Sequence, residues 1–74
     1  RNATEYAVSP EERHAVVVCH GQLFLTKIPE GGKATRLTDH GGADSQPSWS
    51  PDSTKIVFVS DRTGTDEIYV LEQD

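Results

Sequence analysis

The amino-acid sequence predicts an all-β fold, and three observations lead to this prediction. The apolar runs are short and rich in β-branched residues, as in residues 15–18 (AVVV) and 56–59 (IVFV), and such side chains fit a pleated sheet better than a helix. Turn signals that contain Gly or Pro bound these runs. The chain also repeats itself, because residues 8–12 (VSPEE) recur 41 residues later as residues 49–53 (WSPDS).

The repeat extends beyond this turn. Residues 14–19 (HAVVVC) match residues 55–60 (KIVFVS), and residues 23–26 (LFLT) match residues 68–71 (IYVL), where the offset has grown to 45 because the second copy has a longer loop. A period near 41 is typical of a four-stranded β-propeller blade or of a two-helix repeat, and the β-branched runs favour the blade. We therefore expect a single propeller segment over residues 1–74.

The first blade is expected over residues 5–38. Its four strands, from the inner to the outer, are predicted at residues 5–8, 14–19, 22–28 and 34–38. Pro10 occupies the second position of the turn after the inner strand, where its fixed φ suits a tight turn. His20 and Gly21 form a two-residue hairpin connection, in which Gly21 supplies a positive φ. Residues 29–32 (PEGG) form the next turn.

The second blade is expected over residues 46–74, and it lacks an outer strand. Its three strands are predicted at residues 47–49, 55–60 and 67–73. A loop over residues 40–44 (HGGAD) precedes it, and Pro51 takes the turn position that Pro10 has in the first copy. Seven strands correspond to about one and three-quarter blades of four-stranded antiparallel sheet.

Residues 49–62 (WSPDSTKIVFVSDR), followed by residues 67–70 (EIYV), resemble the TolB-type, WD-like β-propeller repeat. That family's pattern is an aromatic residue, Ser-Pro-Asp-Gly, a lysine, an apolar run, Ser-Asp-Arg, a Gly-containing loop and an apolar-Tyr-Val strand. Residues 31–38 (GGKATRLT) resemble the family's outer strand, which commonly ends in Leu-Thr. Such repeats build TolB proteins and the propeller domains of tricorn-like proteases and prolyl-oligopeptidase-type hydrolases. The resemblance implies that the segment is part of a six-bladed propeller.

The chain departs from the family pattern at several positions. Ser53 and Glu12 stand where the family has Gly after Ser-Pro-Asp. The first copy lacks Ser-Asp-Arg and carries Val8 where the second copy has Trp49. This degraded first copy favours the tricorn-like group over TolB proteins.

The motif residues are expected to have structural roles. The two Ser-Pro turns fix the path from the inner to the second strand, Asp61 accepts local backbone N–H bonds, Trp49 packs between blades and Arg62 pairs with a neighbouring acid. The full set of motif residues comprises Ser9, Pro10, Trp49, Ser50, Pro51, Asp52, Asp61, Arg62 and Tyr69. The residues expected to face a central channel are Glu5, Ala7, Gln46 and Ser48.

Catalytic, metal and cofactor chemistry are not expected. The chain has no Gly-x-Ser-x-Gly elbow for a hydrolase nucleophile and no Cys-x-x-Cys or His-x-x-x-His spacing for zinc. Cys19 and His20 are neighbours whose side chains point to opposite faces of a strand, so His20 is expected in a turn and Cys19 as a small buried residue. Asp61, Asp66 and Glu67 could attract calcium, but the EF-hand spacing is absent.

The charge distribution limits the partners. The net charge is −5, with five bases and four acids in residues 1–37 and two bases and eight acids in residues 38–74. This balance argues against nucleic acid and anionic membrane surfaces, which require a basic footprint. No apolar run approaches the roughly 20 residues needed to cross a bilayer. Membrane insertion is therefore not expected, and the acidic second half favours basic partners.

The most direct functional hypothesis is a non-catalytic propeller module that binds a protein or peptide or serves as an assembly scaffold. One alternative is a substrate-gating segment of a tricorn-like or prolyl-oligopeptidase-type serine peptidase. Another is a self-assembling fragment, in which a homo-oligomer of three copies closes a six-bladed ring. Arg1 in place of Met favours a segment whose blades pack with the remainder of a larger propeller. A TolB-like chain would be periplasmic, and a tricorn-like chain cytoplasmic.

Overall fold

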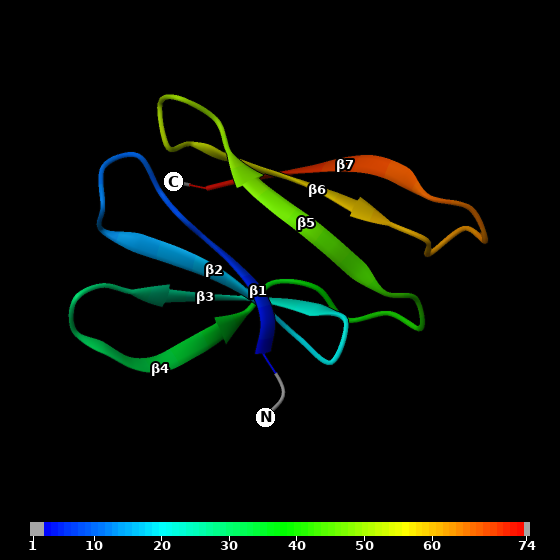
Figure 1. Cartoon of the computed structure of the whole chain (residues 1–74), viewed down its shortest axis with the longest axis horizontal. Helices are drawn as coiled ribbons and strands as arrows, with labels where there is room; N and C mark the ends of the chain where they lie inside the picture. Colours follow the sequence, from blue (N-terminus) through cyan, green and yellow to red (C-terminus); the bar gives the residue numbers. More distant parts are fainter. Residues whose placement is uncertain (1–2, 74) are drawn as a thin grey trace.

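A computed structural model describes residues 3–73, and this part of the chain is all-β with no helix (Figure 1). The seven strands are β1 (Ala3–Val8), β2 (His14–Cys19), β3 (Gln22–Lys27), β4 (Gly31–Arg36), β5 (Asp44–Trp49), β6 (Lys55–Ser60) and β7 (Glu67–Glu72). The predicted all-β fold class is therefore confirmed. In the described residues no helix is long and apolar enough to cross a membrane.

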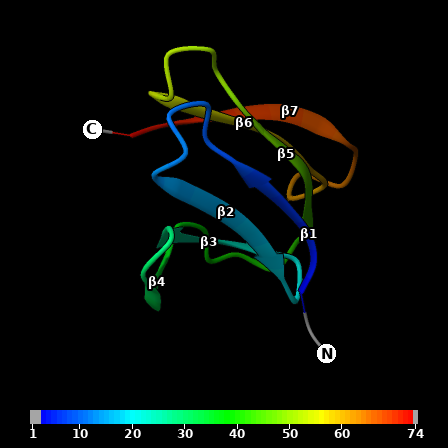
Figure 2. The same ribbon diagram turned by 60° about the vertical axis from the view of Figure 1, so that its left-hand side comes forward.

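The strands form two separate antiparallel sheets. The first sheet has the order β1-β2-β3-β4 and the second has the order β5-β6-β7, so each sheet follows the order of the chain. Figures 1 and 2 show the two sheets facing one another, with the first strand of each, β1 and β5, side by side at the junction. This arrangement is consistent with two neighbouring blades of a propeller.

The hairpin between β2 and β3 has the predicted two-residue connection. Cys19 pairs with Gln22, and the intervening His20 and Gly21 both have positive φ, at 52° and 76°. Two successive positive φ values are typical of the type I′ turn, whose twist matches that of the flanking strands.

Strand β5 begins three residues before its predicted start at Pro47. Pro47 has no backbone N–H and so cannot donate a hydrogen bond to a regular ladder. The structure resolves this with a bulge, because the pairing with β6 is regular at Ser45 and resumes only at Ser48. Gln46, within the bulge, has a φ of 53°. The extra residue leaves Pro47 outside the regular ladder, so the strand continues back to Asp44.

Strand β4 is shifted toward the N-terminus relative to its prediction at residues 34–38. Gly31 pairs with Lys27, so the glycines expected in the turn begin the strand. At the other end, Thr38 lies beyond the strand, and its buried hydroxyl accepts a 2.9 Å hydrogen bond from the backbone N–H of Leu23. The Leu37 N–H still donates to the Leu23 carbonyl at 2.8 Å, and the Thr38 side chain provides the acceptor for the Leu23 N–H in place of a backbone carbonyl.

The hydrophobic core is a single layer between the two sheets. Its fully buried members come from β2, β3 and β6 and are Val16, Val18, Leu23, Ile56 and Phe58. Around these pack the half-buried side chains of Ala7, Leu25, Leu37, Trp49, Tyr69 and Leu71. The opposite face of each sheet carries apolar side chains that remain partly or largely exposed.

Candidate functional site

The two Ser-Pro turns have the same hydrogen-bond pattern. The hydroxyl of Ser9 accepts a bond from the backbone N–H of His14 at 3.1 Å, and the hydroxyl of Ser50 accepts one from that of Lys55 at 2.9 Å. In each turn the serine N–H also donates to the carbonyl of the same partner. Both serine hydroxyls are thus occupied in closing turns, with Pro10 and Pro51 exposed at the second position.

Asp52 stabilises the second turn further. One carboxylate oxygen accepts bonds from the hydroxyls of Thr54 and Ser50 and from the backbone N–H of Thr54, at 2.6, 2.7 and 3.0 Å. These donors, the Thr54 hydroxyl foremost, with the nearby charge of Lys55, lower the pKa of the Asp52 carboxyl to about 2. The first copy has Glu11 at this position, and its carboxylate instead lies 3.5 Å from the Nδ1 of His14.

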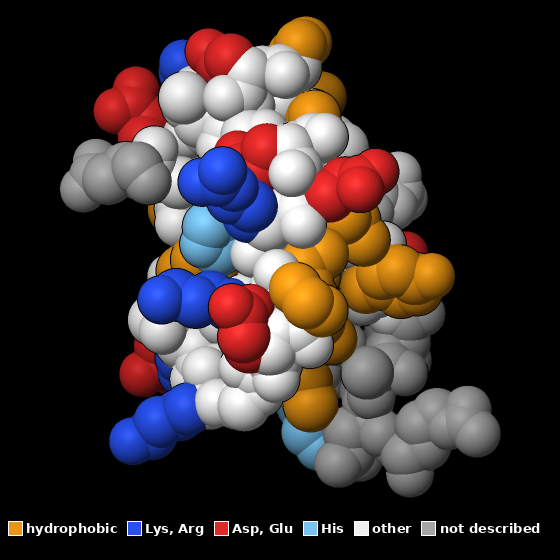
Figure 3. All heavy atoms as spheres, turned by 90° about the vertical axis from the view of Figure 1, so that its left-hand side faces the viewer, with side chains coloured by type: hydrophobic (Ala, Val, Ile, Leu, Met, Phe, Trp, Pro, Cys, Tyr) orange, Lys and Arg blue, Asp and Glu red, His pale blue; other side chains and the backbone are white. Residues whose placement is uncertain are grey.

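The two turns meet at one end of the molecule. The backbone N–H of Glu11 donates to the hydroxyl of Ser53 at 3.2 Å, which joins the first turn to the second. A cleft of about 170 Å³ lies beside this contact and is lined by Glu11, His14, Leu25, Trp49, Asp52, Ser53, Thr54 and Gln73. Figure 3 shows this end, where acidic and basic side chains are interspersed and apolar side chains gather along one side.

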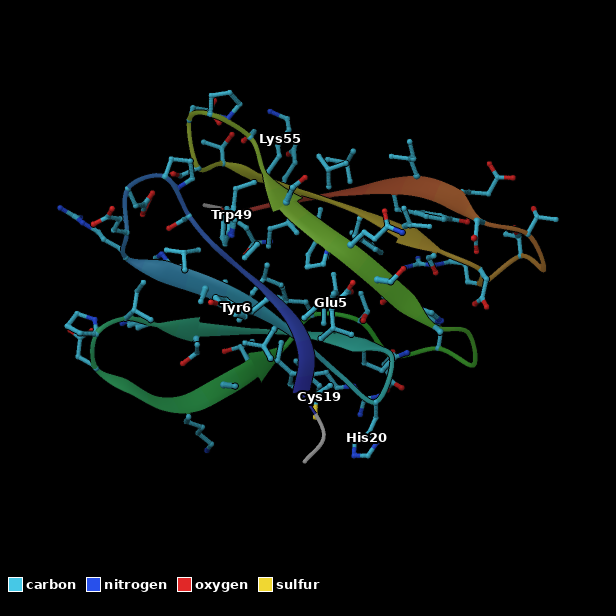
Figure 4. The ribbon with its side chains drawn as sticks, viewed as in Figure 1. Glu5, Tyr6, Cys19, His20, Trp49 and Lys55 are labelled. Atoms are coloured by element: carbon cyan, nitrogen blue, oxygen red, sulfur yellow. The ribbon has the colours of Figure 1, made fainter. Side chains whose placement is uncertain are left out.

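Trp49 joins the two sheets at the seam, the line along which β1 and β5 lie side by side. Its indole nitrogen donates a 2.9 Å hydrogen bond to the backbone carbonyl of Ala7, and its ring packs against the core. Figure 4 shows Trp49 between the end of β5 and the first sheet. Farther along the same seam, the Glu5 carboxylate accepts a 2.7 Å bond from the backbone N–H of Gln46 in the bulge.

The four residues predicted to face a channel lie on the adjacent strands β1 and β5. Gln46 and Ser48 are exposed, whereas Glu5 and Ala7 are half-buried. Ala7 packs against the core between the sheets, and Glu5 is engaged across the seam with Gln46. Their facing a channel remains a prediction.

Arg62 forms a second group of contacts, at the end of β6 that lies away from the Ser-Pro turn. The buried hydroxyl of Ser60 accepts bonds from the backbone N–H and the Nε of Arg62, at 3.3 and 3.2 Å. The guanidinium carbon then lies 4.2 Å from the centre of the Tyr69 ring and 5.5 Å from that of Phe58. The Ser60 hydroxyl therefore orients the arginine over two aromatic rings, an arrangement that favours a cation–π interaction.

Asp61 acts over a longer range than the local turn predicted for it. Its carboxylate accepts a 2.7 Å bond from the backbone N–H of Ala43, which is 18 residues earlier in the chain. The loop can approach this closely because Gly42 has no side chain, and a Cβ at that position would lie 2.7 Å from the Asp61 carboxylate and from the Cα of Arg62. The prediction of a local contact is therefore wrong, since the loop before β5 folds onto the end of β6.

Asp44 is a buried carboxylate that sequence reasoning placed at the end of the loop over residues 40–44. One of its oxygens lies 2.8 Å from the Nε2 of His40 and 3.7 Å from a terminal nitrogen of Arg62, and its side chain is fully buried. Its other oxygen has no hydrogen-bond partner among the described residues. In the sequence, the signal for this pair is the spacing of four residues between His40 and Asp44. That spacing indicates a contact only once the bulge has extended β5 back to Asp44.

The comparisons with known proteins point to one family. A Protein TolB homolog from Chlorobium luteolum is 46% identical over 50 residues, and a Tol-Pal system protein TolB from Bordetella pertussis is 35% identical over 48 residues. A Protein TolB homolog from Protochlamydia amoebophila is 36% identical over 56 residues. Local sequence similarity supports the TolB-type family.

The similarity to TolB proteins covers only part of this chain and a small part of each relative. The matches cover 68%, 65% and 68% of the chain but only 11%, 11% and 12% of the three relatives, so the chain spans about a ninth of their length. A scan against protein-family models found no match.

The positions at which this chain departs from the TolB-type pattern have a clear structural consequence. Glu12 and Ser53 have φ values of 64° and 65°, in the left-handed region where glycine is favoured. The family's glycine therefore fits a backbone requirement of this turn, and both copies here meet the requirement with a residue that has a Cβ.

The described side chains offer structural contacts rather than a catalytic arrangement. The motif serines close turns, His20 is exposed in its hairpin, and Cys19 is half-buried rather than buried as predicted, because it lies on the outer face of the first sheet (Figure 4). Within residues 3–73 no three His, Cys, Asp or Glu side chains are placed to hold a metal ion.

Proposed function

We infer that this chain is a non-catalytic TolB-type propeller segment that binds a protein or peptide partner. The observation that carries the proposal is the junction of the two sheets, where the first strands of both copies, β1 and β5, lie side by side. Within the described residues β1 pairs only with β2 and β5 only with β6, so each has one edge that pairs with no other strand, although Trp49 binds the Ala7 carbonyl and Glu5 binds the Gln46 N–H there. Such edges are a common point of attachment for an extended peptide.

Polar side chains accompany these edges. Gln46 and Ser48 are exposed on β5, and the bulge at Gln46 turns the backbone away from the regular ladder. Bulges often re-aim side chains at functional sites. The net charge of −6 in residues 38–74 favours a partner with a basic surface, since opposite charge accelerates encounter.

The Bordetella relatives are named for the Tol-Pal system, so a purified Pal protein is the first probe. Biolayer interferometry should detect binding to the wild-type chain, and Gln46→Lys, in the exposed bulge, should weaken it about tenfold, because a positive charge would face a basic partner. Thr63→Lys, which adds the same charge in the β6–β7 loop, is the matched control and should bind like the wild type. Absence of binding, or equal weakening by both variants, would overturn the proposal for this partner.

The alternative of a substrate-gating segment in a serine peptidase stays a prediction. A peptidase domain encoded in the same gene would favour it over a binding module.

A further inference from the structure

The outer face of the second sheet resembles the inner face of the first sheet, an apolar surface that the second sheet covers. In the first sheet, Val16 pairs with Leu25 and Val18 pairs with Leu23, and these four residues face the second sheet. Their counterparts in the repeat are Val57, Val70, Val59 and Ile68, which pair in the same register. These counterparts lie on the face that points away from the core, where Ile68 is 74% and Val70 53% exposed.

The outer face of the first sheet shows the reverse correspondence. In the second sheet, Phe58 pairs with Tyr69 and both pack against the core. Their counterparts, Val17 and Phe24, pair in the same register on the outer face of the first sheet. They line a shallow, mostly apolar hollow of about 370 Å³. The outer face of the second sheet therefore resembles the inner face of the first sheet, and the outer face of the first sheet resembles the inner face of the second.

We propose that a second copy of this chain docks head to tail, placing the outer face of its first sheet on the outer face of the second sheet. The interface continues the existing contact between the two sheets, with the same strands in the same register. It is heterologous, because two different faces meet, and such an interface closes into a ring when the rotation per copy permits. The proposal rests on the blade architecture of the proposed function, and it identifies the partner for a different surface from the β1–β5 edges.

The charges of the two halves of the chain support this orientation. Residues 1–37 carry a net charge of +1 and residues 38–74 a net charge of −6. Docking of a first sheet onto a second sheet therefore places a nearly neutral part of the chain against the acidic part, whereas contact between two second sheets would bring two acidic parts together.

One contact of the existing seam is not available to the second copy. Trp49 bonds to the carbonyl of Ala7, and the repeat counterpart of Trp49 is Val8, which is 44% exposed. Val8 offers apolar surface but no donor. The docking between copies is therefore expected to be weaker than the contact within one chain, and Val8→Trp should strengthen it.

The test uses the 74-residue chain in sedimentation velocity over a range of concentrations. The wild type should associate into multiples of its 8.1 kDa mass, with three chains giving the six blades of a closed ring. Val70→Glu should block the outer face of the second sheet. Tyr6, which is 73% exposed, pairs with Val17 on the outer face of the first sheet, so Tyr6→Glu should block that face. Each variant alone should therefore be monomeric. Thr63→Glu in the β6–β7 loop is the matched control and should associate like the wild type.

Mixing the two monomeric variants tests the head-to-tail orientation. Each retains one intact face, so an equimolar mixture should form a one-to-one dimer of twice 8.1 kDa and nothing larger. A wild-type monomer at all concentrations, single variants that associate like the wild type, or a mixture that stays monomeric would overturn the proposal. Circular dichroism confirms that the variants keep their sheets, and a folded monomer that still binds the Pal protein would overturn the docking alone.

Discussion

The indole nitrogen of Trp49 lies 2.9 Å from the backbone carbonyl oxygen of Ala7, and this hydrogen bond ties the last residue of β5 to β1. Trp49→Phe keeps an aromatic ring against the core but removes the donor. We expect the free energy of unfolding to fall by about 1 kcal/mol, the usual net worth of one such bond. Urea denaturation followed by circular dichroism, at one fixed protein concentration, measures the change. An unchanged free energy would show that the bond contributes nothing.

Glu12 has a φ of 64°, a conformation that favours glycine, and its side chain is exposed. Glu12→Gly should raise the free energy of unfolding by up to about 1 kcal/mol, since relief of the strain exceeds the added entropy of the unfolded chain. Glu12→Ala retains the Cβ and is the matched control without this gain. Ser53→Gly should stabilise less, because it also removes the hydroxyl that accepts the bond from Glu11. A destabilised Glu12→Gly would contradict the strain at this position.

Gly42 and Gly41 are adjacent, but only one of them is closely packed. A Cβ on Gly42 would meet the backbone of Arg62 at 2.7 Å, whereas a Cβ on Gly41 would have no neighbour within 4 Å. Gly42→Ala should lower the free energy of unfolding by about 1–3 kcal/mol, the usual cost of overpacking, and Gly41→Ala should leave it nearly unchanged. Thermal denaturation of the two variants under the same conditions gives the comparison. Equal effects would mean that the loop can move away from β6.

Asp52 links the stability of the second turn to pH. Its pKa is lowered to about 2, so its carboxylate stabilises the fold above the ordinary value of 3.8 and loses this effect as the pH falls toward 2. Asp52→Asn should therefore be less stable than the wild type at neutral pH and should lose less stability between pH 4 and pH 2. Asp66→Asn, in an exposed loop, is the control. Urea denaturation at a series of pH values tests this, and parallel curves for wild type and Asp52→Asn would contradict it.

Arg62 is held over Tyr69 by Ser60, and lysine cannot reproduce this geometry. Arg62→Lys removes the Nε donor to Ser60 and the planar group over the ring. The free energy of unfolding should fall by about 1 kcal/mol or somewhat more, as for a partly desolvated cation–π contact. Arg13→Lys, at an exposed position in the first turn, should have little effect. Equal stability of the two lysine variants would indicate that the stacking contributes nothing.

Much of the chain could be predicted from its sequence. The β-branched runs became β2 and β6, the His20-Gly21 pair became a two-residue hairpin, and the second copy followed the first in strand order. These features follow from local preferences, which act between residues close in the chain. The ends of β4 and β5 were less predictable, because a bulge and a side-chain acceptor decided them.

The sequence by itself determined the repeat, the β-branched strands and the turns, because each depends on short-range chemistry and on spacing. Only the tertiary structure decided how these parts meet. The burial of Asp44 with His40 and Arg62, the reach of Asp61 to Ala43 and the bond from Trp49 to Ala7 all depend on how the two sheets and their loops are placed. The physical reason is that residues 18 positions apart become neighbours only when β5 pairs with β6, and residues 42 positions apart only when the two sheets pack.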